Sequence, residues 1–180
     1  MREASNIVLV GPMGAGKSSV GRALAARLGC DFVDADEAIE RRSGRRIAEI
    51  FEHDGEPAFR ALERTLLCEL LDREACVIAT GGGAVLDAGS RRLMRERGRV
   101  VHLHVPVEVQ LQRLEGDRTR PLLMRPDREA ALRALAAVRD PLYDEAAHLR
   151  IDADRGDAQA VAARIEARLF SPDESKDNAA

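Results

Sequence analysis

The sequence predicts an α/β protein in which a parallel sheet is covered by helices on both faces, a three-layer α/β/α arrangement. Short apolar runs that favour buried strands alternate along the chain with segments whose apolar residues repeat at helical spacing. A glycine-rich stretch over residues 11–18 separates the first expected strand from the first expected helix. Parallel strands joined through helices are covered on both sides, which explains why the runs are apolar throughout.

The elements are expected in the following order. Strands are predicted at residues 7–10, 32–33, 76–79, 100–105 and, more weakly, 149–151; helices are predicted over 18–28, 35–41, 57–71 and 128–138. Pro57 suits the first turn of its helix, and Gly29 suits the end of the first helix. Arg139 is expected at the end of the last helix, just before Asp140 and Pro141.

The length of 180 residues predicts a single domain, placed at 1–170 and followed by a disordered polar tail at 171–180. A net charge of -3 argues against a nucleic-acid partner. No apolar run approaches the roughly 18 residues of a membrane span, and the first ten residues lack a secretory signal, so a cytoplasmic location is expected. The three cysteines lack metal-ligand spacing, which favours buried thiols over redox or zinc chemistry.

The stretch Gly-Pro-Met-Gly-Ala-Gly-Lys-Ser at 11–18 predicts a Walker A phosphate loop that binds ATP. Holding a triphosphate requires several backbone N–H groups aimed inward, and a glycine-rich turn that leads into a helix supplies them. Lys17 is expected to bridge the β- and γ-phosphates, and the Ser18 hydroxyl to ligate Mg²⁺. A chance match is expected in roughly one sequence in a thousand or fewer, so the loop is the most specific feature of the chain.

Acidic residues and glycines follow the strands that are expected beside the loop. Asp34 has two interpretations, a helix cap or the acid that holds Mg²⁺ through water, and the phosphate loop favours the second. Asp36 is a candidate to accept the proton of an attacking alcohol or to orient it, the alternative being an exposed helix start. The glycines at 81–83 either leave bare backbone for a small substrate or form a flexible turn.

Two arginines complete the expected acceptor site. Arg60 and Arg139, converging with Asp36, would suit a substrate that carries a carboxylate at one end and hydroxyls at the other. An arginine-rich segment broken by Pro121 and Pro126 is expected to form a mobile loop.

Taken together, these motifs resemble the shikimate kinase family, in the nucleoside monophosphate kinase-like branch of phosphate-loop proteins. The resemblance covers about residues 6–170 and rests on the residues at 11–19, 34–36, 47–51, 55–60, 81–83 and 120–123. It implies the strand order 2-3-1-4-5, a substrate-binding segment at about 34–61 and a mobile lid at about 113–125. It also implies transfer of the ATP γ-phosphoryl group to the 3-hydroxyl of shikimate, with Mg²⁺, on the route to chorismate and the aromatic amino acids.

The resemblance further implies a role for each matching residue. The implied shikimate-binding residues are Asp36, Arg60, Gly82 and Arg139. The implied ATP-binding residues are Gly14, Ala15, Gly16, Lys17, Ser18, Ser19, Arg113, Arg120 and Arg155. The catalytic residues would be Asp36, Lys17 and the lid arginine Arg120, and the metal would be held by Ser18 and Asp34. Glu63 is expected to orient Arg60 from one helical turn away.

Three other functions remain as alternatives. A related small-metabolite kinase, such as a gluconate kinase, would share the loop but not the whole set of rim residues. A nucleoside monophosphate kinase would need a base-binding pocket. A non-catalytic nucleotide-binding module would be expected to have a damaged site, whereas Lys17, Asp34 and Asp36 are intact. We expect a monomer that binds ATP and shikimate, and neither nucleic acid nor membrane.

Overall fold

The computed structural model describes residues 5–73, 75–117 and 126–170. At its centre is a five-stranded sheet with the order β2-β3-β1-β4-β5, in which each neighbouring pair is parallel. The strands are β1 (Asn6–Val10), β2 (Asp31–Asp34), β3 (Cys76–Ala79), β4 (Gly98–His104) and β5 (Leu149–Asp152). The predicted fold class and strand order are therefore confirmed.

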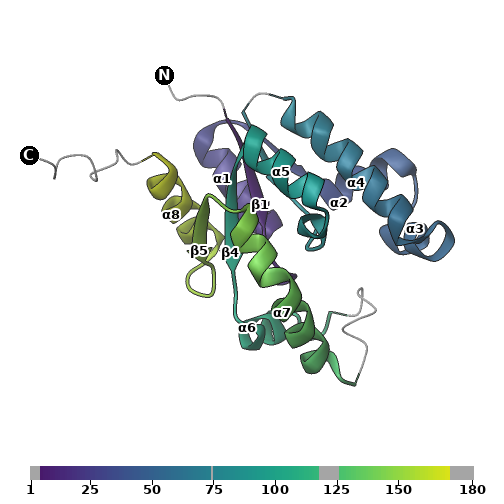
Figure 1. The fold of residues 1–180 in the computed structure, drawn as a ribbon. Coiled ribbons are helices and arrows are strands. Elements are labelled where there is room, and N and C mark those ends of the chain that lie inside the picture. Colours follow the sequence, from purple (N-terminus) through teal and green to yellow (C-terminus); the bar gives the residue numbers. More distant parts are fainter. Residues whose placement is uncertain (1–4, 74, 118–125, 171–180) are drawn as a thin grey trace, which may run out of the picture.

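Helices cover both faces of this sheet. They are α1 (Lys17–Leu28), α2 (Ala35–Ser43), α3 (Ile47–His53), α4 (Gly55–Leu71), α5 (Ala88–Arg97), α6 (Val107–Arg113), α7 (Arg128–Ala146) and α8 (Ala158–Phe170), with a short 3₁₀ helix at Ala84–Leu86. In Figure 1, α1 and α8 lie on one side of the strands, and α4 and α5 lie on the other. The arrangement is the three-layer one that the sequence predicts.

The alternation of side chains along β1 divides the core into two parts. Val8 and Val10 pack into a cluster with residues of α2, α4, α5 and α7. Ile7 and Leu9 point to the opposite face and pack with residues of α1 and α8. Because all of β1 is buried, a shift of register by one residue would exchange its two faces, so its pairing is strongly specified.

The strand register places three connections at one edge of the sheet. Leu9 of β1 and Asp34 of β2 both pair with Ala79 of β3. The residues that follow these strands therefore emerge side by side at the carboxyl ends, which is where ligands bind in open parallel sheets.

Helix α7 is longer than predicted, and the prediction that Arg139 ends it is wrong. The helix continues through Pro141 to Ala146. A proline lacks the N–H for one helical hydrogen bond and disfavours a helix interior. Beyond it, however, Tyr143 and Ala146 are only 1% and 0% exposed, and burial of their side chains favours continuing the helix against the core.

Four helices were not predicted: α3, α5, α6 and α8. Residues 47–51, which contribute to the family resemblance, lie in α3. The buried faces of α3 and α5 are narrow. Ile50 is the buried residue of α3, and the buried residues of α5 are Ser90 and Met94. Periodicity is a weak signal when so few positions of a helix face the core.

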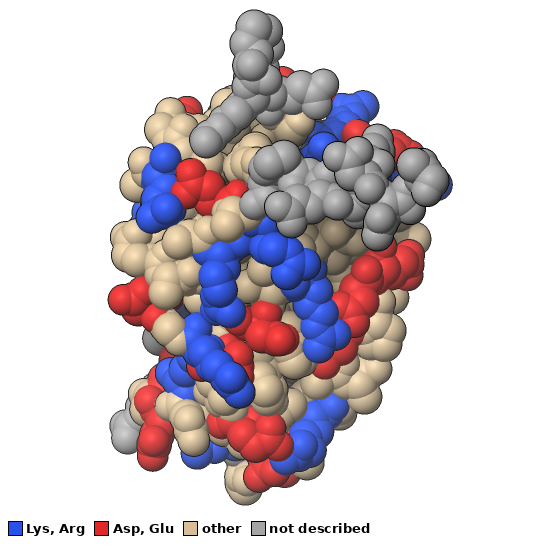
Figure 2. All heavy atoms as spheres, turned by 90° about the vertical axis from the view of Figure 1, so that its left-hand side faces the viewer, with Lys and Arg blue, Asp and Glu red and all other residues tan. Residues whose placement is uncertain are grey.

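The surface carries charges of both signs. On the face that bears α8, Figure 2 shows Lys and Arg side chains interspersed with Asp and Glu, so the described part of this face forms no broad basic surface. Of the cysteines, Cys76 is buried while Cys30 and Cys68 are half-buried, and all three are free thiols. Within the described ranges, none of the helices has the length and apolarity to cross a membrane.

Candidate active site

The phosphate loop connects β1 to α1 and is shaped by its glycines. Gly11 has φ +147°, and a Cβ at this position would lie 2.5 Å from the carbonyl oxygen of Leu103, so only glycine fits. Gly16 has the left-handed φ of +81° that turns the chain into α1. The ammonium of Lys17 donates to the carbonyls of Gly11 and Pro12, both at 2.8 Å. The lysine is thereby held over the loop, next to the helix N-terminus that favours anions.

Asp34 joins the phosphate loop to the start of α2. Its Oδ2 accepts a hydrogen bond from the Ser18 hydroxyl at 2.5 Å. Its Oδ1 accepts from the backbone N–H groups of Asp36 and Glu37, at 3.1 and 3.3 Å, and so caps α2. The cap that the sequence offered as an alternative is present, and it leaves the other carboxylate oxygen beside Ser18.

A cavity of about 380 Å³ opens between the phosphate loop and the carboxyl ends of β2 and β3. Its walls come from five segments that are distant in sequence. They are Met13, Gly14, Gly16, Lys17, Ser18 and Ser19 of the loop, Asp34 and Asp36, Thr80, Gly81 and Gly82, Leu114, and Arg139. The cavity thus brings together most of the predicted phosphate-binding, metal-binding and acceptor-binding residues.

Arg60 is not among the residues that line this cavity, but its guanidinium lies against Gly83, next to the lining residue Gly82. Its guanidinium pairs with Glu63 at 2.7 Å and with Glu56 at 3.1 Å, so the predicted contact with Glu63 is present. The Glu63 side chain is 4% exposed. Burial raises the pKa of Glu63, the carboxylate of Asp36 adds to the rise, and Arg60 opposes it. A buried partner on the same helix restricts the rotamers that Arg60 can adopt.

The three glycines after β3 make room for these side chains. A Cβ on Gly81 would lie 2.8 Å from Oδ1 of Asp36 and 3.1 Å from Oε1 of Glu63. A Cβ on Gly83 would overlap the guanidinium of Arg60. The sequence offered two interpretations, bare backbone for a small substrate or a flexible turn. In the structure, the glycines at 81 and 83 leave room for charged side chains of the protein itself.

Two functional candidates were missed by sequence reasoning. Tyr143, the one tyrosine of the chain, donates its hydroxyl hydrogen to the carbonyl of Gly82 at 2.6 Å. Thr80 donates to the carbonyl of Leu9 at 3.0 Å and lines the cavity. The available signal for Tyr143 was its spacing of four residues from Arg139, which places both on one face of a helix. This signal was not used because the helix was predicted to end at Arg139, before Tyr143.

A second cavity, of about 270 Å³, lies on the other side of the phosphate loop. Arg113 lines it, donating to the carbonyls of Gly14 at 3.0 Å and Ala153 at 2.6 Å. Its lining includes the predicted ATP-binding residues Gly14, Ala15, Gly16, Ser19 and Arg113. The side chain of Arg155 is 90% exposed and lies 3.7 Å from Asp154. Arg120 and most of the expected lid lie outside the described residues.

Known proteins resemble this chain over nearly its whole length. Residues 13–170 match the family model described as shikimate kinase. A shikimate kinase from Xanthomonas campestris pv. campestris (strain 8004) is 52% identical over 169 residues, which cover 94% of each chain. The solved structure of a shikimate kinase from Acinetobacter baumannii in complex with shikimate has a TM-score of 0.89 at 50% identity, and the match covers 93% of each chain.

A gluconokinase from Sinorhizobium meliloti 1021 is a more distant structural neighbour. Its TM-score is 0.54 at 20% identity, over 94% of this chain and 98% of the gluconokinase. At that identity the likeness extends to the fold alone.

Proposed function

The chain belongs to the shikimate kinase family, and we propose that it transfers the γ-phosphoryl group of ATP to the 3-hydroxyl of shikimate, giving shikimate 3-phosphate and ADP. One observation carries the proposal: a single cavity is lined both by the phosphate loop, with Lys17, and by the acceptor rim, with Asp36 and Arg139. A donor and an acceptor bound in that space would meet without water between them, which is the main requirement of phosphoryl transfer.

The acceptor is proposed to bind between two cations and one carboxylate. The shikimate carboxylate pairs with Arg60 and Arg139, because guanidinium groups bind carboxylates with directional hydrogen bonds. Glu63 holds Arg60 in place through the 2.7 Å ion pair. Asp36 faces the acceptor hydroxyl and either takes its proton or orients it toward the γ-phosphate.

The nucleotide is proposed to bind on the opposite wall. Backbone N–H groups from Gly14 to Ser19 surround the phosphates at the start of α1. The adenine is assigned to the second cavity, which Arg113 lines. Arg155 is not among the lining residues, and its contact with the nucleotide stays a prediction. Closure of Arg120 over the phosphates stays a prediction.

The residues present fit a magnesium ion. Ser18 and Asp34 place a hydroxyl and a carboxylate oxygen together beside the phosphate loop, and the cavity adjoins both. Mg²⁺ prefers such hard oxygen donors and usually takes few from the protein, since phosphate oxygens and waters complete its coordination. Ser18 would ligate the ion directly and Asp34 through water. When bound, the ion would supply positive charge that offsets the negative charge of the phosphates.

The chemistry of the protein is then mainly electrostatic. Lys17 follows the γ-phosphoryl group and stabilises the charge on its equatorial oxygens. Asp36 steers the hydroxyl into line from the other side. The expectations of a cytoplasmic monomer, and of one kinase domain over residues 1–170, stay predictions.

The test is ADP release with Mg²⁺ and ATP, measured for shikimate, quinate, gluconate and nucleoside monophosphates one at a time. We expect shikimate to stimulate ADP release well above the acceptor-free rate and the other compounds to do so weakly or not at all. Failure of shikimate to stimulate would refute the proposal. Stronger stimulation by gluconate would instead place the protein with the metabolite kinases that share its fold.

A further inference from the structure

The glycines after β3 form a tight turn whose central peptide bond lies next to the acceptor site. The N–H of Ala84 donates to the carbonyl of Gly81 at 3.2 Å, closing the turn. Gly83, the third residue, has φ -96° and ψ -1°, the values of a type I turn. The two central residues, Gly82 and Gly83, are both glycine.

A turn of this composition has two accessible forms. Rotation of the central peptide converts type I into type II, which requires a positive φ at the third residue, and glycine adopts this without steric cost. Because the peptide is planar and trans, the rotation reverses the carbonyl of Gly82 and the N–H of Gly83 together. The sequence of the turn therefore permits both forms, and it does not decide which way the carbonyl of Gly82 and the N–H of Gly83 point.

The Tyr143 hydroxyl holds the carbonyl that would reverse. It donates to this oxygen at 2.6 Å, and the residue is 1% exposed. Burial raises the pKa of Tyr143 to about 12, so the hydroxyl keeps the proton that it donates throughout the neutral range. Loss of this donor would leave a partly buried carbonyl without this partner, at a cost in free energy, so the hydrogen bond favours the observed form of the turn.

Tyr143 is itself held firmly by the body of the protein. The centroid of its ring lies 5.1 Å from the centroid of the His102 ring. His102 also contacts Asp144, the residue after Tyr143 in α7, with 2.8 Å between Nδ1 of His102 and Oδ1 of Asp144. Since Asp144 accepts only, Nδ1 carries the hydrogen. This bond attaches α7 to β4, and the ring of Tyr143 cannot leave without opening the core.

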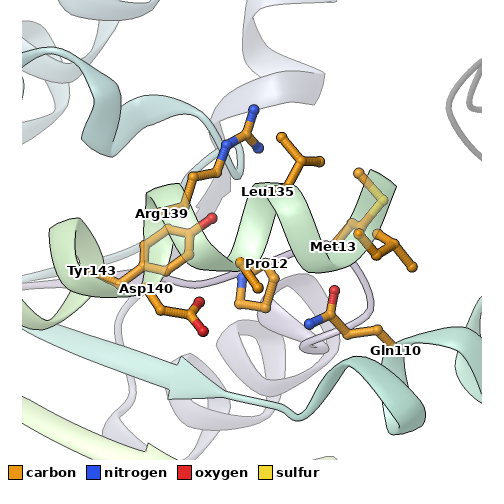
Figure 3. Close-up of a pocket in the computed structure, with 9 residues that line it drawn as sticks. Pro12, Met13, Gln110, Leu135, Arg139, Asp140 and Tyr143 are labelled. Atoms are coloured by element: carbon orange, nitrogen blue, oxygen red, sulfur yellow. The ribbon is translucent and has the colours of Figure 1, made fainter. Parts of the chain in front are cut away.

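Tyr143 also adjoins Arg139 and the phosphate loop. The two side chains project from neighbouring turns of α7 toward the same side, with Pro12 and Met13 of the loop beside them (Figure 3). The cavity among them measures only about 10 Å³, about enough for one water molecule. A Cβ on Gly82 would lie 3.5 Å from the tyrosine oxygen and 3.6 Å from Nη1 of Arg139. The hydroxyl, the turn and the substrate arginine thus form one packed unit.

We propose that Tyr143 is a positioning residue for the acceptor: its hydroxyl selects one of the two orientations of the Gly82–Gly83 peptide and so sets the backbone surface on which shikimate rests beside Arg139. The inference rests on the proposed function, since it assigns the acceptor to this rim. It concerns the acceptor and not the nucleotide, because the turn belongs to the rim and not to the phosphate loop.

The test is Tyr143→Phe, which retains the buried ring and removes the hydroxyl. We expect the KM for shikimate to rise about tenfold, as for loss of one hydrogen bond, and the KM for ATP to stay within about twofold. The amide resonances of Gly82 and Gly83 should shift in the ¹⁵N spectrum of the ligand-free variant, which provides a readout that needs no activity.

Asn6→Ala is the matched control. Asn6 donates from a buried amide to the carbonyls of Leu71 at 3.0 Å and Arg73 at 2.7 Å. It lies at the amino end of β1, at the opposite end of the strands from the acceptor rim. Both variants should lower Tm, but only Tyr143→Phe should change the KM for shikimate and the two glycine resonances. Unchanged resonances, or an equal KM change in both variants, would overturn the inference. A wild-type protein that shikimate does not stimulate would count against the proposed function instead, and the resonances would still decide the role of Tyr143.

Discussion

The two walls of the active-site cavity are built in different ways. The phosphate loop is one continuous segment, and its lysine contacts carbonyls five and six residues earlier in the chain. The acceptor rim is assembled from the starts of α2 and α4, the turn after β3 and the middle of α7. One of its hydrogen bonds joins Gly82 and Tyr143, which are 61 residues apart.

This difference indicates how each wall should respond to mutation. The loop geometry follows from local glycine conformations, so its side chains can be removed without disturbing the acceptor. The rim depends on how distant elements pack, so a change of one methyl group can displace a binding side chain. Variants of the two walls should therefore separate the kinetic constants for ATP and for shikimate.

The largest effect is expected from Lys17→Met in the loop. It removes the cation that stabilises the transferring phosphoryl group, and kcat should fall on the order of 10³-fold. The KM for shikimate should stay within about twofold, because Lys17 takes no part in the acceptor rim. Steady-state kinetics with each substrate varied would measure both constants.

Arg27→Met is the control for this loss of charge. Arg27 is a cation on α1 that pairs with Glu166 at 2.8 Å, on the side of the helix that faces α8. Its kcat should match that of the wild type. If Lys17→Met retained more than a tenth of wild-type kcat, the role assigned to this lysine would be wrong.

A smaller effect, confined to the acceptor, is expected from Gly83→Ala. The added methyl group would overlap the guanidinium of Arg60, which must move away from its pairing with Glu63. The KM for shikimate should rise about thirtyfold, on the scale of one lost charged hydrogen bond, with the KM for ATP unchanged. Gly89→Ala, in α5, is the matched control and should alter neither constant. An equal rise in both KM values would show that the two walls are not independent.

The smallest effect is expected in stability and depends on pH. His102 is fully buried, and burial lowers its pKa, with Asp144 opposing and Arg150 and His104 adding to the fall. The folded state therefore binds the proton less readily than the unfolded chain does. The contribution of neutral His102 is complete above the unfolded pKa of about 6.5 and declines as pH falls below that value, by at most about 1.4 kcal/mol per pH unit.

His102→Leu tests this expectation because leucine does not titrate. The difference in unfolding free energy between wild type and variant, measured by urea unfolding, should shift in favour of the variant between pH 7.5 and 5.5. Asn6→Ala carries no titrating group at the changed position, and its difference from wild type should stay constant. If the difference in unfolding free energy were also constant for His102→Leu, His102 would bind its proton equally well in the folded and unfolded states, and the expectation would be wrong.

Much of the fold and one wall of the site could be predicted from the sequence. The alternation of buried strands and helices, and the phosphate loop between the first pair, depend on neighbouring residues. Asp34, at the end of a strand, could be placed beside the loop once the loop itself was recognised, and there it contacts Ser18. Arg60 and Glu63 could be paired because both lie on one helix, at i and i+3.

The other features were decided only by the tertiary structure. Helix α7 passes through Pro141 because burial of Tyr143 and Ala146 outweighs the lost hydrogen bond, and no local pattern reports that balance. Asp36 and Glu63 meet at Gly81 because the strand register brings their segments together. The sequence by itself thus determined the loop that binds phosphate, since contiguous residues build it, whereas packing between distant segments decided the acceptor rim and the place of Tyr143 beneath it.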